Sequence, residues 1–326
     1  MNQSSSSPAS IARPFTKRED ALALYRPEEL KHPLILSCPH SGRTYPDSFL
    51  TQSCLNSYSI RRSEDAYVDR MLKPMVEANA LAMVQALFPR AYVDVNREEL
   101  ELDPAMFSDP LPERANTTSP RVNAGLGTVP RSVSTHIDIY DKPLPYAEAQ
   151  ARLEDCYRPY HQALDNLIRE AQADFGYCIV LDCHSMPGLN LPGMNSAFRQ
   201  LNPFAPRQAA NRTSLSLDFV LGDRFGTSCH DAVSSSAQER LATCGFNVLH
   251  NTPYAGGYIT RHYGAPSKGV HLLQIEISRQ LYMDENTLEP TSGMQSVEQA
   301  LNAVIDSLLS LDPDELEQLD YPLAGQ

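Results

Sequence analysis

The sequence predicts an α/β fold with a mixed, mainly parallel β-sheet and helices on both of its faces. Short apolar runs typical of strands alternate along the chain with longer segments of helical periodicity. Some runs, such as CIVL at 178–181, are apolar at every position, as in strands that are buried on both faces. The composition changes abruptly nowhere, so we expect a single α/β domain over residues 13–326, preceded by a disordered tail at 1–12.

The expected elements follow from local composition. Apolar and β-branched runs predict strands at 34–38, 82–87, 91–95, 177–183, 218–223, 246–251 and 272–278. Helical patterns predict helices at 63–79, 146–173, 229–243 and 292–310. The first of these helices has Ser63 as its expected N-cap and acidic residues in its first turn. The Pro-, Asn- and Gly-rich stretch 103–145 is expected to be irregular, and ordered segments of that length usually serve a function.

The charge balance argues against nucleic acid as a partner. Forty acidic residues against 27 basic ones give a net charge of -13, whereas phosphate binding needs clustered Lys and Arg. No apolar run is long enough for a membrane helix, and the N-terminus lacks the features of a signal peptide. The seven cysteines are scattered without a CxxC pair, which favours a reducing compartment, so we expect a cytoplasmic protein. Nothing in the sequence indicates an oligomeric state.

Residues that can do chemistry follow the predicted strands. His40 comes after the strand at 34–38, His184 ends the strand at 177–183, and Asn96 and Arg97 come after 91–95. The carboxyl ends of parallel strands meet at one edge of a sheet, where open α/β proteins bind their ligands. We therefore expect these side chains to share one site, although a single histidine in such a place is more often a hydrogen-bonded core residue.

Nucleophilic catalysis and nucleotide binding fit the sequence poorly. Ser41 and Ser185 each follow a histidine directly, but adjacent residues on a strand point to opposite faces, so that histidine is a poor base for its neighbour. Cys183, which precedes His184, has the same difficulty. The chain also lacks a G-x-S-x-G elbow, a P-loop and a dinucleotide-binding fingerprint.

A metal site fits the residues better. A catalytic zinc takes three nitrogen or oxygen ligands from the protein and keeps a fourth position for water. His40 and His184 supply two of these ligands, and the start of the helix at 63–79 offers Glu64 and Asp65 as the third. A donor set of this kind fits zinc, but it does not distinguish zinc from manganese, iron or cobalt.

Three further residues are candidates for roles around such a metal. Glu276 lies between two isoleucines in a predicted strand and is a candidate base for the proton of the activated water, or else forms a buried ion pair with an arginine such as Arg279. An arginine side chain can hold a carboxylate by two hydrogen bonds, which makes Arg97 and Arg261 candidates for substrate binding. For each of them a surface salt bridge is the alternative.

Six blocks of sequence resemble the N-formylglutamate amidohydrolase family. They are PHSGRTYP, SEDAYVDRM, VDVNRE, LDCHSMPG, DFVLGDRFGTSC and the long GGYITRHYGAP with GVHLLQIEISRQLYMDE, and they run in order from about 34 to 286. The resemblance implies a phosphorylase/hydrolase-like fold related to zinc carboxypeptidases and aspartoacylases. It also implies zinc-dependent hydrolysis of N-formyl-L-glutamate to formate and L-glutamate, a step in histidine degradation.

The resemblance implies roles at matching positions: metal binding by His40, Asp65 and His184, general base catalysis by Glu276, and carboxylate binding by Asn96 and Arg97. The sequence departs from the wider group in one respect. The carboxypeptidases and aspartoacylases carry the first histidine and the carboxylate ligand in one H-x-x-E turn, whereas positions 41–43 here are Ser-Gly-Arg. We therefore place the carboxylate at Asp65, with its neighbour Glu64 as the alternative.

The expected mechanism adds Arg43 and His262 and gives Arg261 a further role. Arg43 or Arg261 is expected to help the metal stabilise the oxyanion. Arg261 is also expected to bind a substrate carboxylate, and His262 either assists in the pocket or is a structural loop residue. Two other functions stay open: a zinc hydrolase acting on another N-acyl amino acid or a small peptide, and a non-catalytic protein that binds dicarboxylates. The presence of Glu276 together with both histidines argues against the second.

Overall fold

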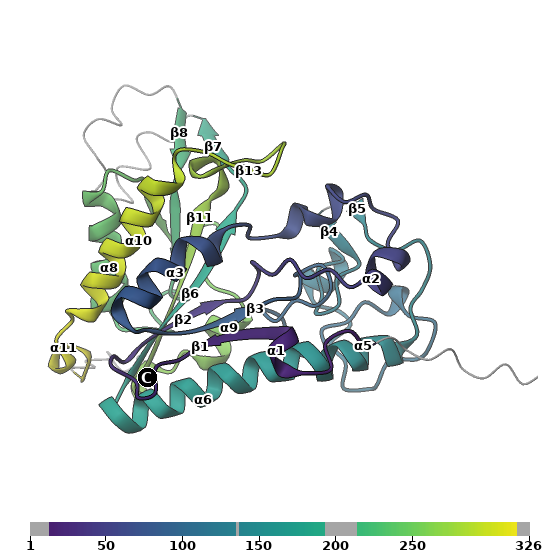
Figure 1. Ribbon diagram of the computed structural model, residues 1–326, viewed down its shortest axis with the longest axis horizontal. Helices are drawn as coiled ribbons and strands as arrows, with labels where there is room; N and C mark the ends of the chain where they lie inside the picture. The colour runs from purple at the N-terminus through teal and green to yellow at the C-terminus, as the bar shows by residue number, and fades with distance from the viewer. Residues whose placement is uncertain (1–12, 135–136, 193–213, 318–326) are drawn as a thin grey trace, which may run out of the picture.

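The structure, a computed structural model, describes residues 13–134, 137–192 and 214–317, so the tail expected at 1–12 lies outside the described residues. Its centre is a seven-stranded sheet (Figure 1). The strand order is β1 (Leu22–Tyr25), β3 (Ala82–Ala86), β2 (Leu34–Cys38), β6 (Cys178–Met186), β11 (Val270–Ser278), β9 (Phe219–Gly222) and β10 (Val248–His250).

The middle of this sheet is parallel and its two edges are not. β3, β2, β6 and β11 run in the same direction, and β1 pairs antiparallel with β3 at one edge. At the other edge β9 pairs antiparallel with β11 and parallel with β10. The carboxyl ends of β2, β6 and β11 therefore meet at one edge, and the predicted α/β class with a mixed, mainly parallel sheet is confirmed.

Helices cover both faces of the sheet (Figure 1). One face packs against α3 (Val68–Asn79), α8 (Asp231–Thr243) and α10 (Met294–Leu309), and the other against α6 (Arg158–Phe175) and α9 (Tyr258–Tyr263). The sheet separates two hydrophobic cores, and successive side chains of a strand point alternately into one and the other. In β6, Leu181 and Cys183 lie in the core on the α3 side and Val180 lies in the core on the α6 side. Along α6 the buried residues recur at helical spacing, and the helix ends at Gly176, whose φ of 83° is left-handed.

The remaining elements are short. A π-helical turn (Leu153–Tyr157) joins α5 (Tyr146–Arg152) to α6, so the helix predicted at 146–173 is present as one run. The others are α1 (Arg18–Ala21), α2 (Asp47–Gln52), α4 (Pro120–Asn123), α11 (Pro313–Glu317), the pairs β4 (Ser132–Ser134) with β5 (Ile137–Asp138), β7 (Leu189–Pro192) with β8 (Ser214–Leu217) and β12 (Met283–Asp284) with β13 (Glu289–Pro290), and 3₁₀ turns at Ser59–Ser63, Pro104–Met106, Pro266–Lys268 and Arg279–Leu281. No helix in the described parts of the chain is long and apolar enough to span a membrane.

Two expectations about local structure are wrong. Residues 91–95 form turns and not a strand, because their apolar side chains are buried beneath the irregular segments next to the sheet and not along a partner strand. Ser63 does not cap α3, since it ends a 3₁₀ turn, and the helix begins at Val68 after Tyr67. Strand β1 was not expected: it is a four-residue strand whose pattern is too short to stand out.

Candidate metal centre and active site

Three of the predicted residues meet at the carboxyl ends of the parallel strands. His40 follows β2, His184 lies in β6, and Asp65 lies just before α3; all three are buried. The Nδ1 atoms of the two histidines are 3.1 Å apart. Oδ2 of Asp65 lies 3.1 Å from Nδ1 of His184 and 3.3 Å from Nδ1 of His40. The atoms that could bind a metal thus form a small triangle.

The triangle has the size that a metal requires. Ligand atoms bound to zinc at its usual bond lengths with tetrahedral angles are about 3.3 Å from one another. The three distances of 3.1, 3.1 and 3.3 Å agree with that spacing. Two ring nitrogens and a carboxylate oxygen so close together share either a proton or a metal ion. The His40, Asp65 and His184 group can therefore hold a metal, and its geometry does not identify which one.

Two aspartates orient the histidine rings. Nε2 of His40 lies 2.8 Å from Asp94, and Nε2 of His184 lies 2.9 Å from Asp182. In the tautomer in which each carboxylate accepts the Nε2 proton, each Nδ1 has a lone pair that faces the triangle and can bind a metal. Asp182 also accepts a 2.6 Å hydrogen bond from Ser37, whose hydroxyl oxygen is 2.9 Å from the Tyr160 hydroxyl on α6. The imidazoles are thus held from behind by buried polar groups.

Hydrogen bonds hold Asp65 with one oxygen toward the histidines. Its N–H donates to the carbonyl oxygen of His40 at 3.0 Å. Its Oδ1 accepts from Arg279 at 3.1 Å and from Ser185 at 3.2 Å, which leaves Oδ2 for the triangle. Burial by itself raises the pKa of Asp65, but hydrogen bonds with His184 and His40 lower the pKa well below its usual range. The third position of the triangle is therefore filled by an ionised carboxylate.

Glu64 does not share this role. Its carboxylate faces Arg61, with contacts of 3.0 and 3.1 Å, and accepts a 2.7 Å hydrogen bond from the Tyr45 hydroxyl. Of the two carboxylates that the sequence left open, the structure brings Asp65, and not Glu64, to the histidines.

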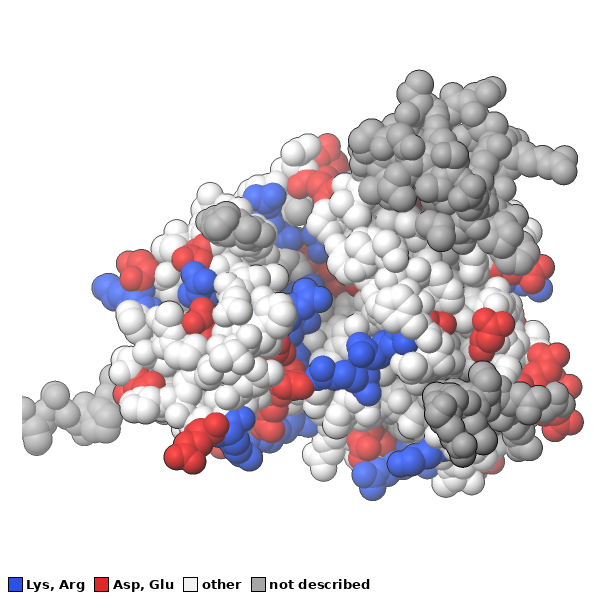
Figure 2. Space-filling view, turned by 180° about the vertical axis from the view of Figure 1, so that it is seen from behind, with Lys and Arg blue, Asp and Glu red and all other residues white. Residues whose placement is uncertain are grey.

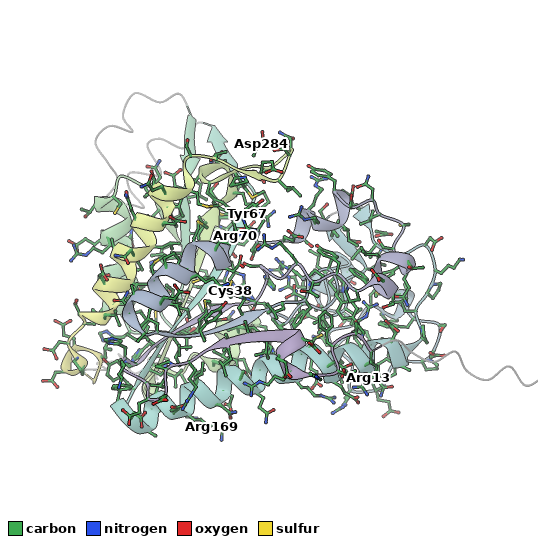
Figure 3. All side chains as sticks on the ribbon, viewed as in Figure 1. Arg13, Cys38, Tyr67, Arg70, Arg169 and Asp284 are labelled. Atoms are coloured by element: carbon green, nitrogen blue, oxygen red, sulfur yellow. The ribbon has the colours of Figure 1, made fainter. Side chains whose placement is uncertain are left out.

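A strained turn connects Asp65 to α3. Tyr67 has a φ of 68°, a left-handed conformation that is rare for an aromatic residue. Its hydroxyl donates to the carbonyl of Leu288 at 2.8 Å, and the guanidinium of Arg70 lies 5.1 Å from its ring centre (Figure 3). Ser41 supports the same turn by donating to the carbonyl of Asp65 at 2.8 Å. The serine after His40 therefore serves the backbone and not nucleophilic catalysis.

Glu276 lies next to this group. It is opposite His184 in the parallel β6–β11 register, so both side chains point to the same face of the sheet. Burial raises the pKa of Glu276 to about 7, which suits a group that exchanges a proton near neutral pH. Gln274 donates to its carboxylate at 2.9 Å. The alternative ion pair with Arg279 is not formed, since the nitrogens of Arg279 contact Asp65, Ser185 and a backbone carbonyl.

The site opens into a cavity of about 720 Å³. His40, His184 and Glu276 line it, together with a group of residues that carry positive charge: Arg62, Arg90, Arg97, Arg121 and Arg279. Figure 2 shows a hollow in the middle of one face of the molecule, with basic side chains along it and acidic ones inside. A cavity with this lining favours anionic ligands, although the chain as a whole carries a net charge of -13.

Asn96 and Arg97 both line the cavity. The Asn96 side-chain oxygen accepts from the N–H of Ile259 at 2.8 Å, which fixes its amide 3.3 Å from the His184 ring. A Cβ atom at Gly257 would clash with that amide, so only glycine fits there while the amide keeps its position. Arg97 donates to the carbonyls of Leu126 and of Asn96, and burial lowers its pKa to about 10. The pair is thus preorganised on the cavity wall.

The structure does not bring three predicted residues to the cavity. Arg43 contacts Asp69 at 3.3 Å and is not among the residues that line the cavity. Arg261 and His262 lie on the exposed side of α9, where Arg261 pairs with Glu98. The glycines around this helix favoured a ligand-binding loop, but they do not determine which way the helix turns its polar side chains.

Sequence reasoning missed several residues that act behind the ligands. A signal for Asp182 was present, because it precedes His184 by two positions and so shares its face of β6. Asp94 precedes Asn96 by two positions and accepts its backbone N–H at 2.8 Å. Arg90 and Arg121 lie in segments without periodicity, and nothing in their local sequence indicates the cavity.

The fold and the site define a class of protein: an α/β protein of hydrolase type with a buried His-Asp-His group that can hold a metal. Comparison with known proteins is more specific. Residues 32–283 match the family model described as N-formylglutamate amidohydrolase. The chain belongs to the N-formylglutamate amidohydrolase family, as the resemblance predicted.

Individual relatives agree with this assignment. The N-formylglutamate deformylase of Pseudomonas aeruginosa is 27% identical over 280 residues, which cover 85% of this chain and 91% of that protein. The deformylase of Pseudomonas putida matches with the same identity and coverage. The crystal structure of N-formylglutamate amidohydrolase from Ralstonia eutropha JMP134 matches with a TM-score of 0.74 and 33% identity over 88% of this chain and 97% of that one. A gene product of Agrobacterium tumefaciens, 20% identical with a TM-score of 0.58 over 90% and 95%, shares the fold.

Proposed function

We propose that this protein is a zinc-dependent amidohydrolase that cleaves N-formyl-L-glutamate to formate and L-glutamate. The observation that carries the proposal is the triangle of His40, Asp65 and His184 next to Glu276, on a cavity lined with arginines. The names of the relatives support the substrate, because the Pseudomonas and Ralstonia proteins are described as acting on N-formylglutamate.

His40, Asp65 and His184 would hold the metal. When bound, it supplies Lewis acidity and lowers the pKa of a coordinated water toward neutrality. Glu276 accepts the proton of the water that attacks the formyl carbon. It then passes this proton to the amide nitrogen as the carbon–nitrogen bond breaks, so that formate and the free amine of glutamate leave.

The substrate is oriented by groups already in place on the cavity wall. Arg97 presents its guanidinium to the cavity while its own hydrogen bonds fix its position. Its hydrogen bonds to a carboxylate are charge-assisted and stronger than those between neutral groups. In this proposal Arg97, with the amide of Asn96, binds the α-carboxylate of the substrate.

Formate release from N-formyl-L-glutamate tests the proposal. The purified protein should release formate, lose this activity with a chelator and regain it when zinc is added. N-acetyl-L-glutamate and N-formyl-L-alanine serve as comparison substrates. If a protein that contains one metal per chain releases nothing from N-formyl-L-glutamate but cleaves another N-acyl amino acid, the substrate assignment is wrong and the hydrolase assignment stands.

A further inference from the structure

The arginines of the cavity differ in whether an acidic partner neutralises them. Arg90 lies 2.9 Å and Arg97 3.5 Å from the same oxygen of Asp94. Arg279 lies 3.1 Å from Asp65. These three guanidinium groups therefore share two carboxylates within the protein.

Arg62 and Arg121 have no such partner: the structure shows no ion pair for either exposed side chain among the described residues, although both line the same cavity. The carbonyl of Arg62 accepts from Arg279 at 3.1 Å, on the side of the metal site, whereas Arg121 is the one that is linked to Arg97. The stretches of chain outside the described ranges contain a single acidic residue, Asp320. Arg121 thus keeps a full positive charge on the cavity wall.

The backbone fixes the position of Arg121 relative to Arg97. Its carbonyl accepts a hydrogen bond from the N–H of Leu126 at 2.8 Å, and the carbonyl of Leu126 accepts from Nε of Arg97 at 2.8 Å. Ser119 caps the short helix α4 that carries Arg121, accepting from the N–H of Val122 at 3.0 Å. One loop therefore holds two arginines, and the charge of Arg121 contributes to the lowered pKa of Arg97.

Two neighbouring cations of which only one is neutralised favour a ligand that brings its own negative charges. An N-acyl derivative of an acidic amino acid carries two carboxylates. We propose that Arg121 binds the side-chain carboxylate of such a substrate and determines the preference of the site for acidic N-acyl amino acids, while Arg97 binds the α-carboxylate. This inference rests on the proposed amidohydrolase function and goes beyond it by naming the group that distinguishes a glutamate from a glutamine derivative.

The test compares two substrates that differ in one charge. N-formyl-L-glutamate and N-formyl-L-glutamine have nearly the same shape, so an Arg121→Gln variant should lose activity only with the first. We expect kcat/KM for the glutamate derivative to fall about 10- to 100-fold, mostly through KM, because one charge-assisted contact is removed. An Arg121→Lys variant should recover part of this loss. Arg121 is exposed, so the variants should fold.

Arg261→Gln is the matched control. It removes an exposed arginine that pairs with Glu98 outside the cavity, and it should leave both substrates unaffected. A parallel loss for both substrates in Arg121→Gln, or no loss for either, would overturn the inference. If the wild-type protein cleaves neither substrate, the proposed function fails. Calorimetric binding of N-formyl-L-glutamate then tests independently whether Arg121 binds a carboxylate. Binding that is weaker in Arg121→Gln would support the carboxylate site, and equal binding or none would refute it.

Discussion

The two halves of the cavity are built in opposite ways. In the metal half, the polar atoms around the ligands are paired: Asp94 and Asp182 hold the histidines, and Arg279 and Ser185 hold Asp65. In the substrate half, Arg121 keeps its charge without an acidic partner among the described residues. The paired half, like Asn96 and Arg97 in the substrate half, can keep its geometry before any ligand arrives, whereas the charge of Arg121 is left for a ligand to neutralise. This difference separates the residues that shape the site from those that select a substrate.

The largest expected effect comes from Glu276, which lies where the halves meet. A Glu276→Gln variant keeps the side chain's size and its contact with Gln274 but can no longer accept a proton. We expect kcat to fall about 10²- to 10⁴-fold, the usual contribution of a general base. The metal content should stay near that of the wild type, as measured by elemental analysis of the purified variant. A variant that keeps full activity would remove Glu276 from the mechanism.

The next effect concerns stability at low pH, through His161 on α6. Its Nε2 lies 2.9 Å from the carbonyl oxygen of Val95, in the turn between Asp94 and Asn96 that joins the two halves. Burial lowers the pKa of His161 to about 4. As the pH falls below about 6.5, His161 becomes protonated in the unfolded chain but stays neutral in the folded protein. Acidification therefore stabilises the unfolded state relative to the folded one.

From this shift we expect His161 to contribute about 3 kcal/mol to the loss of unfolding free energy between pH 7 and pH 4. Urea denaturation at several pH values measures it. A His161→Gln variant is expected to be less stable at pH 7, because it changes two partly buried contacts, but to lose less stability on acidification. Stability curves that stay parallel for the variant and the wild type would contradict this role.

A smaller effect is expected from Asp182, behind the metal half. An Asp182→Asn variant keeps an oxygen near His184 but removes the charge that orients its ring. We expect metal affinity to fall about 10- to 100-fold, as is typical for such partners of metal-binding histidines. Competition with a chelator of known affinity measures this. Asp165→Asn is the control, since this aspartate forms an exposed ion pair with Arg169 on α6 and should not change metal binding.

The paired half was largely predictable from the sequence. His40 and His184 come at the ends of apolar runs, and the carboxyl ends of parallel strands converge, so one-dimensional patterns place them together. Glu276 was found for a similar reason, as a charge between two isoleucines. Asp65 and Glu64 were both expected as the third ligand at the start of a helix, and the choice of Asp65 rested on the family resemblance. The predictions of the two histidines and of Glu276 depend on the regular part of the chain, whereas Asp65 lies in a loop.

The substrate half was predictable only in part. Asn96 and Arg97 line the cavity as the sequence predicts, and their role in substrate binding stays a prediction. The sequence wrongly predicts a strand just before them, because a buried turn can carry the same pattern of apolar residues. Arg261 was expected at the cavity and Arg121 was not considered. Both are arginines in segments with glycine nearby, and what separates them is the direction of the side chain and the presence of Glu98, which pairs with Arg261. Ion-pair partners of this kind depend on tertiary contacts, which cannot be predicted from the local sequence.

The residues of β6 and β11 disfavour a shifted register between these two strands. Glu276 stands opposite His184, and the residues on either side of it, Ile275 and Ile277, belong to the apolar core of the other face. A slip of one residue between these strands would turn the carboxylate into that core and the isoleucines toward His40, Asp65 and His184. Burying an unpaired carboxylate in an apolar core costs several kcal/mol. The alternation that makes the sheet fold thus also excludes this shifted alignment, so in a stably folded chain Glu276 stands beside His184.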